Sequence, residues 1–277
     1  MMEPFILESQ EYFKIKEWIE RYPGLEVGFT TKNGGVSQQD AFTGLNFGFH
    51  VGDEQNAVCE NRLLLADKIS FPLSSWVGAE QTHDIRIAKI GKLDQGRGSV
   101  TYDSSFSGTD GFLTEEQGIL LTLCFADCVP LYFIEPETRM IGVAHAGWKG
   151  TVHGIAAEMV SKFQQNGAKT EKISAVIGPS ICKKCYIVDE RVVNLVKNIL
   201  DGVDILPYNQ VSEGQFSLDL KELNRQILLR AGVEDGNIHV TDYCTSCHSE
   251  HFYSHRRDKG NAGRMMAYIG WKEDSRP

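Results

Sequence analysis

Apolar residues in this chain gather into short runs that predict β-strands. The runs are rich in β-branched and aromatic residues and end at glycine, proline or polar residues, as strands typically do. The predicted strands cover residues 25–30, 85–90, 119–125, 129–134, 140–144, 173–177, 238–241 and 265–269. The apolar stretch 118–134 is interrupted by Asp127 and Pro130 and is shorter than the roughly 20 residues of a membrane span. We therefore predict two buried strands there.

A second pattern, with apolar residues three and four positions apart, predicts helices. The clearest helix begins near Thr151, and its apolar stripe consists of Val152, Ile155, Ala156, Met159, Val160 and Phe163. Residues 54–68 form a second predicted helix, which Asp53 can cap, and residues 218–231 form a third. Because hairpins mix irregularly with single helices, we predict an α+β fold rather than a regular doubly wound one.

Three residues with good metal-binding side chains stand at the polar ends of apolar runs. His83 ends the segment QTH, Cys128 lies in ADCVP, and His145 lies in AHAGWKG. Two imidazoles and one thiolate fill three corners of a zinc tetrahedron and leave the fourth for water or substrate, which distinguishes a catalytic zinc site from a closed structural one. The sequence therefore predicts zinc-dependent chemistry with these three residues as ligands.

Hairpin geometry supports the pairing of two of these ligands. The predicted strands on either side of residues 135–138 can form a hairpin with a four-residue loop. If Ile134 and Arg139 close that loop, Cys128 lies directly opposite His145. Opposed Cβ atoms are about 4.5–5.5 Å apart, so one ion could bridge the two side chains. A loop one residue longer would place them on opposite faces of the sheet.

Other interpretations of these residues stay open. Cys128 could be the nucleophile of a metal-free cysteine hydrolase, with His145 as its base. A non-enzymatic zinc-binding module would instead need a fourth protein ligand. Asp127 could orient a histidine or act as a general base through zinc-bound water, and the alternative is an ordinary strand-end aspartate.

The charge balance limits the partners of the chain. With 28 basic and 37 acidic residues, its net charge of -9 argues against non-specific binding to nucleic acid or to anionic membranes. An anionic substrate therefore needs a local cluster of cations. Arg256 and Arg257 begin such a cluster near the C-terminus. Lys149, beside a predicted helix start, is a further candidate for anion binding, although the glycines around it could serve only a tight turn.

A glycine pair lies in the loop that follows the first predicted strand. Asn33 and Ser37 flank Gly34 and Gly35 there, so the backbone could approach a ligand closely. The spacing matches neither of the common phosphate-binding glycine motifs, and a simple turn is the alternative.

Cysteine usage favours reduced thiols. No basic and apolar signal sequence opens the chain, so we expect a cytoplasmic protein, folded as a single domain over residues 1–277. Seven cysteines in such a protein favour free thiols over disulfides. Cys182 with Cys185, and Cys244 with Cys247, form two Cys-x-x-Cys pairs that could assemble a structural zinc site. The pairs lie about sixty residues apart, beyond ribbon-type spacing, and buried free thiols are the alternative.

These segments together resemble the YfiH/YlmD family, once described as multicopper polyphenol oxidases or laccase-domain proteins and now regarded as purine nucleoside phosphorylases. The segments that carry the resemblance are FTTKNGGVS at 29–37, ENR at 60–62, QTH at 81–83, ADCVP at 126–130, AHAGWKG at 144–150, IGPSI at 177–181, and RRD with GRM between 256 and 265. The resemblance implies a four-layer α/β/β/α sandwich with mixed sheets, and zinc on His83, Cys128 and His145. His255 departs from the aromatic residue expected at its position.

The resemblance also implies a function. We expect phosphorolysis of adenosine, inosine and guanosine to the free base and ribose 1-phosphate, cleavage of S-methyl-5′-thioadenosine, and deamination of adenosine at the same site. Asp127 would join the three zinc ligands as a catalytic residue. The candidates for binding nucleoside and phosphate are Lys149, Arg256, Arg257, Asn33 and Ser37.

Copper-dependent polyphenol oxidation is a less favoured alternative. A multicopper oxidase needs about ten histidines, typically in His-x-His pairs. This chain has eight histidines and no such pair. Two histidines and a cysteine also match the equatorial ligands of blue copper, so copper is the alternative metal for the predicted site.

Overall fold

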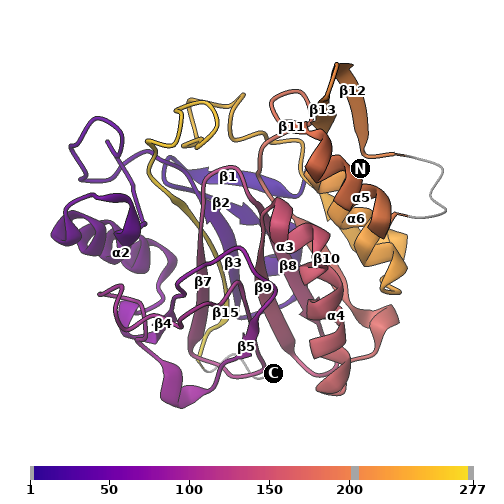
Figure 1. Ribbon diagram of the computed structural model, residues 1–277. Coiled ribbons are helices and arrows are strands. Elements are labelled where there is room, and N and C mark those ends of the chain that lie inside the picture. Colours follow the sequence, from indigo (N-terminus) through magenta and orange to yellow (C-terminus); the bar gives the residue numbers. More distant parts are fainter. Residues whose placement is uncertain (1–2, 201–205, 274–277) are drawn as a thin grey trace.

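Two mixed six-stranded sheets face each other in the computed structural model, which describes residues 3–200 and 206–273 (Figure 1). In sheet one the strand order is β1 (Phe5–Ser9), β2 (Tyr12–Ile15), β3 (Leu25–Thr30), β15 (Met265–Trp271), β7 (Ile119–Phe125) and β4 (Trp76–Val77). In sheet two it is β14 (Ile238–Val240), β10 (Ser174–Ile177), β8 (Val129–Glu135), β9 (Met140–Ala146), β6 (Gly111–Thr114) and β5 (Ile87–Lys89). A small third sheet has the order β11 (Ile187–Asp189), β13 (Gln215–Leu218) and β12 (Tyr208–Ser212).

Helices cover the outer faces of the two large sheets. The α-helices are α1 (Lys16–Arg21), α2 (Gln55–Ile69), α3 (Trp148–Val152), α4 (Ile155–Gln165), α5 (Glu190–Ile199) and α6 (Leu220–Arg230), and the short 3-10 helices are Phe49–Val51, Leu73–Ser75, Lys92–Asp94, Thr170–Lys172 and Asp235–Asn237. Helix α2 packs on sheet one, and α3 to α6 lie on the opposite side of the molecule, over sheet two (Figure 1). None of the helices in the described residues combines the length and the apolar composition that crossing a bilayer requires.

Three apolar cores hold these layers together. Leu65 and Ile69 of α2 pack against Trp76 and Tyr268 on the outer face of sheet one. Aromatic rings such as Phe29, Phe125 and Tyr132 fill the space between the sheets, and a third core joins helices α3 to α6 to sheet two. The predicted α+β fold and the four-layer α/β/β/α sandwich are confirmed.

All eight predicted strands are present, with ends that move by at most two residues, but two helix predictions need correction. The helix expected to start near Thr151 is divided into α3 and α4, because Gly154 between them has a φ of 88°, outside the helical region. The cap predicted for α2 is wrong as well. Glu54 occupies the capping position without a side-chain bond, and the Asp53 carboxylate accepts hydrogen bonds from Ser37 and Asn46.

The predicted hairpin forms with a different register. It closes at Glu135 and Met140, so His145 pairs with Pro130 and not with Cys128. The Glu135 carboxylate accepts hydrogen bonds from residues 137 and 138, and Arg139 takes a turn conformation with a φ of 57°, which places the loop at residues 136–139. Both strands shift by one residue, so the side-chain alternation is preserved and Cys128 stays on the face of His145.

The chain crosses between the two sheets three times at one end of the sandwich. Residues 78–86 lead from β4 to β5, residues 126–128 from β7 to β8, and residues 241–264 from β14 to β15. His83, Cys128 and the predicted arginines lie on these crossings. His145 lies at the same end, near the end of β9. The topology therefore places the candidate residues beside the gap between the sheets.

Candidate active site

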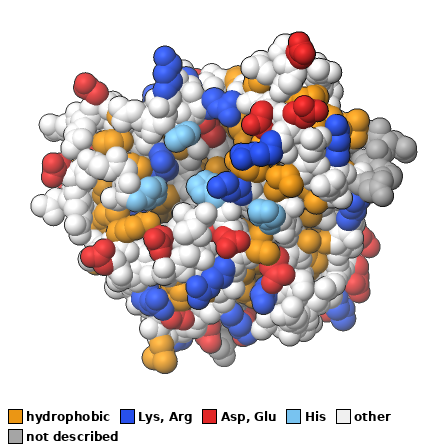
Figure 2. All heavy atoms as spheres, in the orientation of Figure 1, with side chains coloured by type: hydrophobic (Ala, Val, Ile, Leu, Met, Phe, Trp, Pro, Cys, Tyr) orange, Lys and Arg blue, Asp and Glu red, His pale blue; other side chains and the backbone are white. Residues whose placement is uncertain are grey.

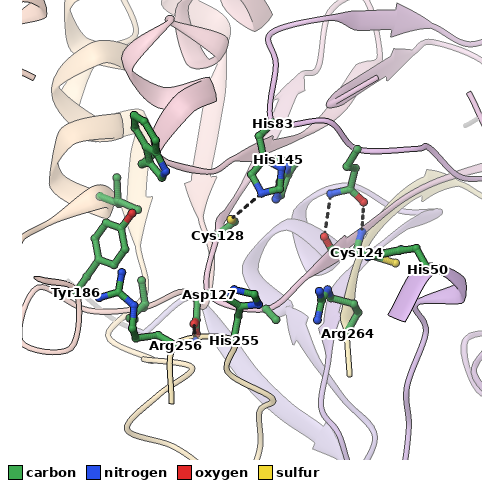
Figure 3. Close-up of a pocket in the computed structure, with 15 residues that line it drawn as sticks. His50, His83, Cys124, Asp127, Cys128, His145, Tyr186, His255, Arg256 and Arg264 are labelled. Carbon is green, nitrogen blue, oxygen red and sulfur yellow. Dashed lines mark hydrogen bonds between the residues drawn. The ribbon is translucent and has the colours of Figure 1, made fainter. Parts of the chain in front are cut away.

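The structure brings His83, Cys128 and His145 together at this end of the sandwich (Figure 3). Their potential ligand atoms all lie within 4.8 Å of one another, and the Sγ of Cys128 is 3.8 Å from the Nε2 of His83. A zinc ion bound to sulfur and nitrogen would hold those atoms roughly 3.3–3.5 Å apart in a tetrahedron. Small side-chain movements would bring the three residues onto one ion, so the donor set fits zinc.

The exposure of the three side chains increases from His145 through Cys128 to His83. His145 is buried, Cys128 is partly buried and His83 is exposed. Within the described part of the chain, no other histidine, cysteine or acidic residue belongs to this group. An ion held here would therefore keep a coordination position for water or substrate, which does not fit a closed module with four protein ligands.

Asp110, which the sequence did not point to, holds two of the ligands in place. Its buried carboxylate lies 2.8 Å from the Nδ1 of His145 and accepts hydrogen bonds from the backbone N–H groups of Thr82, His83 and Asp84. With Nδ1–H donating to Asp110, the Nε2 of a neutral His145 keeps its lone pair for a metal. This carboxylate–histidine pair is the usual support of a histidine ligand.

Cys128 and His145 change each other's protonation in the absence of a metal. Burial alone would raise the pKa of Cys128, but the charge of His145 and hydrogen bonds from both histidines outweigh it and lower the pKa to about 6. Burial alone would lower the pKa of His145, but Cys128 and Asp110 outweigh it and raise the pKa to about 9. The thiolate that zinc requires is therefore available at neutral pH.

Gly147 leaves the space that the ligands need. A Cβ atom built on it would lie 2.8 Å from the Cδ2 of His83 and 3.1 Å from the Sγ of Cys128. Even an alanine at this position would push the two ligands away from their present places. The glycine that follows β9 is therefore required by its close approach to the ligand group, because its extended backbone, with a φ of -67°, would itself accept other residues.

Asp127 faces the cavity because the backbone bends there. Its φ of 84° interrupts the extended conformation that would have turned its side chain away from Cys128. The carboxylate accepts hydrogen bonds of 2.6 Å from the Thr245 hydroxyl and from the backbone N–H of Arg256. It therefore ties the crossing between β7 and β8 to the segment before β15, and its role as a general base stays a prediction.

A cavity of about 490 Å³ opens beside the ligand group, a size suited to a small molecule. The lining residues are His50, Gln81, His83, Cys124, Ala126, Asp127, Cys128, His145, Trp148, Ile181, Tyr186, Leu220, His255, Arg256 and Arg264. Figure 2 shows histidine side chains beside lysine and arginine side chains near the centre of one face. The cavity therefore joins a candidate metal group to cations and to aromatic rings.

Two arginines supply the positive charge of the cavity. The guanidinium of Arg256 lies 4.8 Å from the ring centre of Tyr186 and donates to the carbonyl of Ile187. Arg264 is partly buried and donates to the carbonyl of Gly263. Desolvation in the cavity wall and the nearby charge of Arg264 lower the pKa of His50 to about 4, so this imidazole is neutral at pH 7.

Four of the predicted substrate-binding residues do not line this cavity. Lys149 is exposed, with its ammonium 5.8 Å from the ring of Trp148. The guanidinium of Arg257 pairs with Asp258 and donates to backbone carbonyls. Asn33 donates to the carbonyl of Glu250, and Ser37 donates to a carboxylate beside α2. The structure thus gives these four residues contacts elsewhere, while Arg256 lies in the cavity.

Several lining residues carried a signal that sequence reasoning did not use. Arg264 and Trp148 lie in the quoted segments GRM and AHAGWKG, and Gln81 lies in QTH. The Gln81 amide donates to the carbonyl of Cys124 and accepts from its N–H, which fastens the His83 segment to the end of β7. His50 lies in no motif that we identified, and only the structure places it in the cavity.

Comparisons with known proteins agree with this geometry. Residues 26–272 match the family model described as multi-copper polyphenol oxidoreductase laccase. The chain is 46% identical over 274 residues to "Purine nucleoside phosphorylase YlmD" of Bacillus subtilis, a match that covers 98% of both chains. It is 33% identical over 263 residues to "Adenosine deaminase RL5" of an unknown prokaryotic organism, which covers 95% of this chain and 98% of the relative.

A solved structure shows the same fold. The crystal structure of YlmD from Geobacillus stearothermophilus superposes with a TM-score of 0.95 at 44% sequence identity, covering 98% of this chain and 100% of that one.

Proposed function

Because this chain belongs to the family of multi-copper polyphenol oxidoreductase laccases, among them the similar YfiH and YlmD proteins, we propose that it is a zinc-dependent purine nucleoside phosphorylase. The proposal depends on one observation above all: a single cavity joins the group His83, Cys128 and His145 to Arg256 and Arg264. The name of the relative with 46% identity supports the same activity.

The cavity offers each part of the reaction a suitable surface. Trp148, Tyr186 and Leu220 present aromatic and apolar surface for a purine. Arg256 and Arg264 present positive charge for phosphate. In phosphorolysis a phosphate oxygen bonds to C1′ of the ribose as the C1′–N9 bond breaks, and the departing purine takes a proton. The arginines would hold phosphate against the sugar while positive charge develops there.

Adenosine deamination is the second activity that we propose for this site. The relative named adenosine deaminase and the open position beside the three ligands favour it. A bound zinc would supply hydroxide at neutral pH, the nucleophile that attack on C6 of adenine requires. Asp127 is placed in the same cavity, where its carboxylate could accept the proton of that water.

Copper-dependent oxidation is supported less well by the described residues. Of the two groups of potential metal ligands found among residues 3–200 and 206–273, one contains histidine and the other consists of four cysteines. A trinuclear copper centre, which is built from histidines, has no counterpart in this part of the chain.

The test is release of hypoxanthine from inosine, measured by chromatography with and without phosphate. We expect release only with phosphate, together with ribose 1-phosphate. Release without phosphate would replace phosphorolysis by hydrolysis, and no release would refute the proposal. Ammonia release from adenosine, which needs no phosphate, tests deamination separately.

Variants connect the activity to the cavity. Arg264→Met should raise the KM for phosphate by about tenfold or more, because a charge-assisted hydrogen bond contributes about 1.5–3 kcal/mol. Lys162→Met removes a cation from the outer surface of α4 and serves as the matched control, for which we expect an unchanged KM. Equal effects of the two substitutions would show that Arg264 does not bind phosphate.

A further inference from the structure

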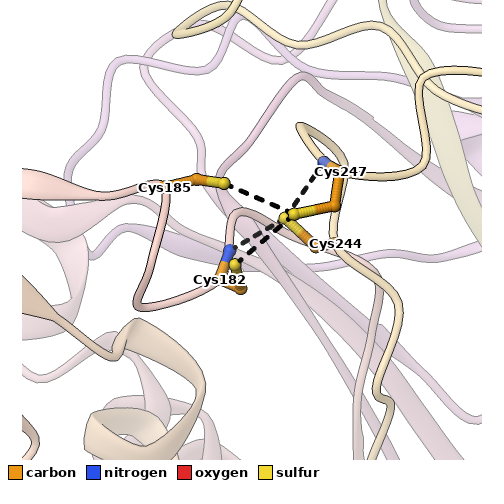
Figure 4. Close-up of side chains that lie close together, drawn as sticks. All are labelled: Cys182, Cys185, Cys244 and Cys247. Carbon is orange, nitrogen blue, oxygen red and sulfur yellow. Dashed lines mark hydrogen bonds between the residues drawn. The ribbon is translucent and has the colours of Figure 1, made fainter.

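Four cysteines outside the cavity gather into a second group. Cys182 and Cys185 follow β10, and Cys244 and Cys247 follow β14, its parallel neighbour in sheet two. The four sulfur atoms all lie within 4.8 Å of one another (Figure 4). The Sγ of Cys247 is 3.9 Å from that of Cys182 and 3.4 Å from that of Cys185. Segments about sixty residues apart in sequence thus converge on one point.

These distances match a tetrahedron of thiolates around one ion. Zinc–sulfur bonds of about 2.3 Å place the sulfurs of a tetrahedral site about 3.8 Å apart. The separations around Cys247 lie on either side of that value. All four thiols are free. The group therefore has the type of ligand, the number of ligands and the sulfur–sulfur distances of a closed zinc site.

Backbone groups around Cys244 add independent support. This cysteine is buried, and its sulfur accepts hydrogen bonds from the N–H groups of Cys182, at 3.2 Å, and Cys247, at 3.4 Å. Both hydrogen bonds hold the Cys244 side chain toward the other three sulfurs, as outer hydrogen bonds orient metal ligands. Each donor belongs to a cysteine of the same group, so the two Cys-x-x-Cys turns meet at the sulfur of Cys244.

We propose that Cys182, Cys185, Cys244 and Cys247 bind one structural Zn²⁺, separate from the ion at the catalytic site. Four thiolates complete its coordination, so this ion has no open position and takes no part in catalysis. The wide sequence spacing, which argued against such a site, is bridged by the parallel pairing of β10 with β14 and by the bridge between Ser180 and Cys244.

The proposed ion would fasten one wall of the substrate cavity. Ile181 and Tyr186, on either side of the first cysteine pair, line that cavity. Thr245, inside the second pair, donates its hydroxyl hydrogen bond to Asp127. The ion would therefore fix the position of two lining side chains and of the residue that orients Asp127.

Metal content of the purified full-length protein tests the proposal. We expect about two zinc ions per chain in the wild type, about one in Cys247→Ser and about one in Cys128→Ser, because each variant disrupts one tetrahedral site. Cys59→Ser, which changes a thiol outside both groups, should keep both ions. Cys247 is exposed, so its replacement is expected to leave the chain folded.

Cobalt substitution provides a second readout that does not depend on activity. Cobalt in a four-thiolate site gives intense charge-transfer and visible bands, and we expect Cys247→Ser to weaken them while Cys128→Ser leaves them in place. Unchanged zinc content in Cys247→Ser, iron in place of zinc, or a Cys182–Cys185 or Cys244–Cys247 disulfide in freshly purified protein would overturn the proposal. If Cys247→Ser loses zinc while Cys128→Ser keeps the wild-type zinc content, the structural site is supported and the proposed phosphorylase activity does not depend on zinc.

Discussion

Replacing Asp110 by asparagine tests how the site prepares His145 for a metal. One carboxylate oxygen, Oδ1, faces the Nδ1 of His145 and the N–H of His83. The other, Oδ2, accepts from the N–H groups of Thr82 and Asp84. The asparagine side chain would keep the shape of the aspartate but would replace one of these acceptors by an NH₂ donor.

The structure predicts which orientation the amide of Asp110→Asn takes. With NH₂ at the Oδ2 position, two backbone donors lose their acceptor, at a cost of about 1–3 kcal/mol each. With NH₂ at the Oδ1 position, only one backbone donor, the N–H of His83, loses its acceptor, at a cost of about 1–3 kcal/mol. In this cheaper orientation the amide donates to the Nδ1 of His145, so the ring proton moves to Nε2 and blocks the atom that faces the metal.

We therefore expect Asp110→Asn to fold with a moderately lower free energy of unfolding and to lose zinc affinity at the catalytic site. Loss of such a supporting carboxylate typically weakens metal binding by about 10–100-fold, equivalent to about 1.4–2.7 kcal/mol. Competition with a fluorescent chelator measures the affinity, and ¹⁵N chemical shifts of the His145 ring in metal-free protein report the tautomer.

Asp84→Asn is the matched control for this experiment. Asp84 lies in the same segment, is exposed, and accepts through one oxygen from the N–H of Ile85, a role that an asparagine oxygen can keep. We expect wild-type zinc affinity in this variant. If Asp110→Asn also binds zinc as tightly as the wild type, or if its His145 tautomer is unchanged, the carboxylate does not prepare the ligand and the reasoning fails.

Three further predictions concern the ligand group. Gly147→Ala should weaken zinc binding by about tenfold or more, because its methyl group would displace His83 and Cys128. Gly91→Ala is the control, because a Cβ atom there would meet no atom within 4 Å. Equal zinc affinities of the two variants would contradict the packing argument. In metal-free protein, the rate of alkylation of Cys128, followed by peptide mass spectrometry, should fall as the pH falls through about 6. The rate should change little between pH 6 and about 9, where His145 loses its proton. A midpoint near pH 9 would show that Cys128 is not a thiolate at neutral pH. Chelation should abolish phosphorolysis and added zinc should restore it, whereas full activity without metal would favour the cysteine hydrolase.

Local sequence patterns located the three candidate ligands, which the structure brings together, because each signal lies within one short segment. Apolar runs with a polar end located Cys128 and His145, and strand alternation kept them on one face even though the hairpin register was wrong. When the pairing shifts by one residue in both strands, the two side chains stay on the same face of the sheet. A shift in only one strand would have placed them on opposite faces. This part of the site was therefore robust to the inaccuracy of the prediction.

Other parts of the site depend on contacts that no local pattern encodes. Asp110 accepts from His145 and from residues 82–84, which lie more than twenty-five positions away from it in sequence. Arg257 and Arg264 look alike in the basic segment, yet Arg257 is bound by Asp258 and Arg264 reaches the cavity. Because cation clustering in sequence does not show which side chain is already paired, only one of the five predicted substrate-binding residues, Arg256, lines the cavity.

The topology connects both cysteine-containing groups to one cavity. Asp127 lies on the crossing from β7 to β8, next to the candidate ligand Cys128 and two residues beyond the end of β7. Its carboxylate is fixed by Thr245, which lies within the second Cys-x-x-Cys pair. A displacement of that pair would therefore act on Asp127 directly and on Cys128 through one peptide bond. Loss of the proposed structural ion should accordingly alter catalysis through the position of Asp127, while His83 and His145 keep their own support from Asp110.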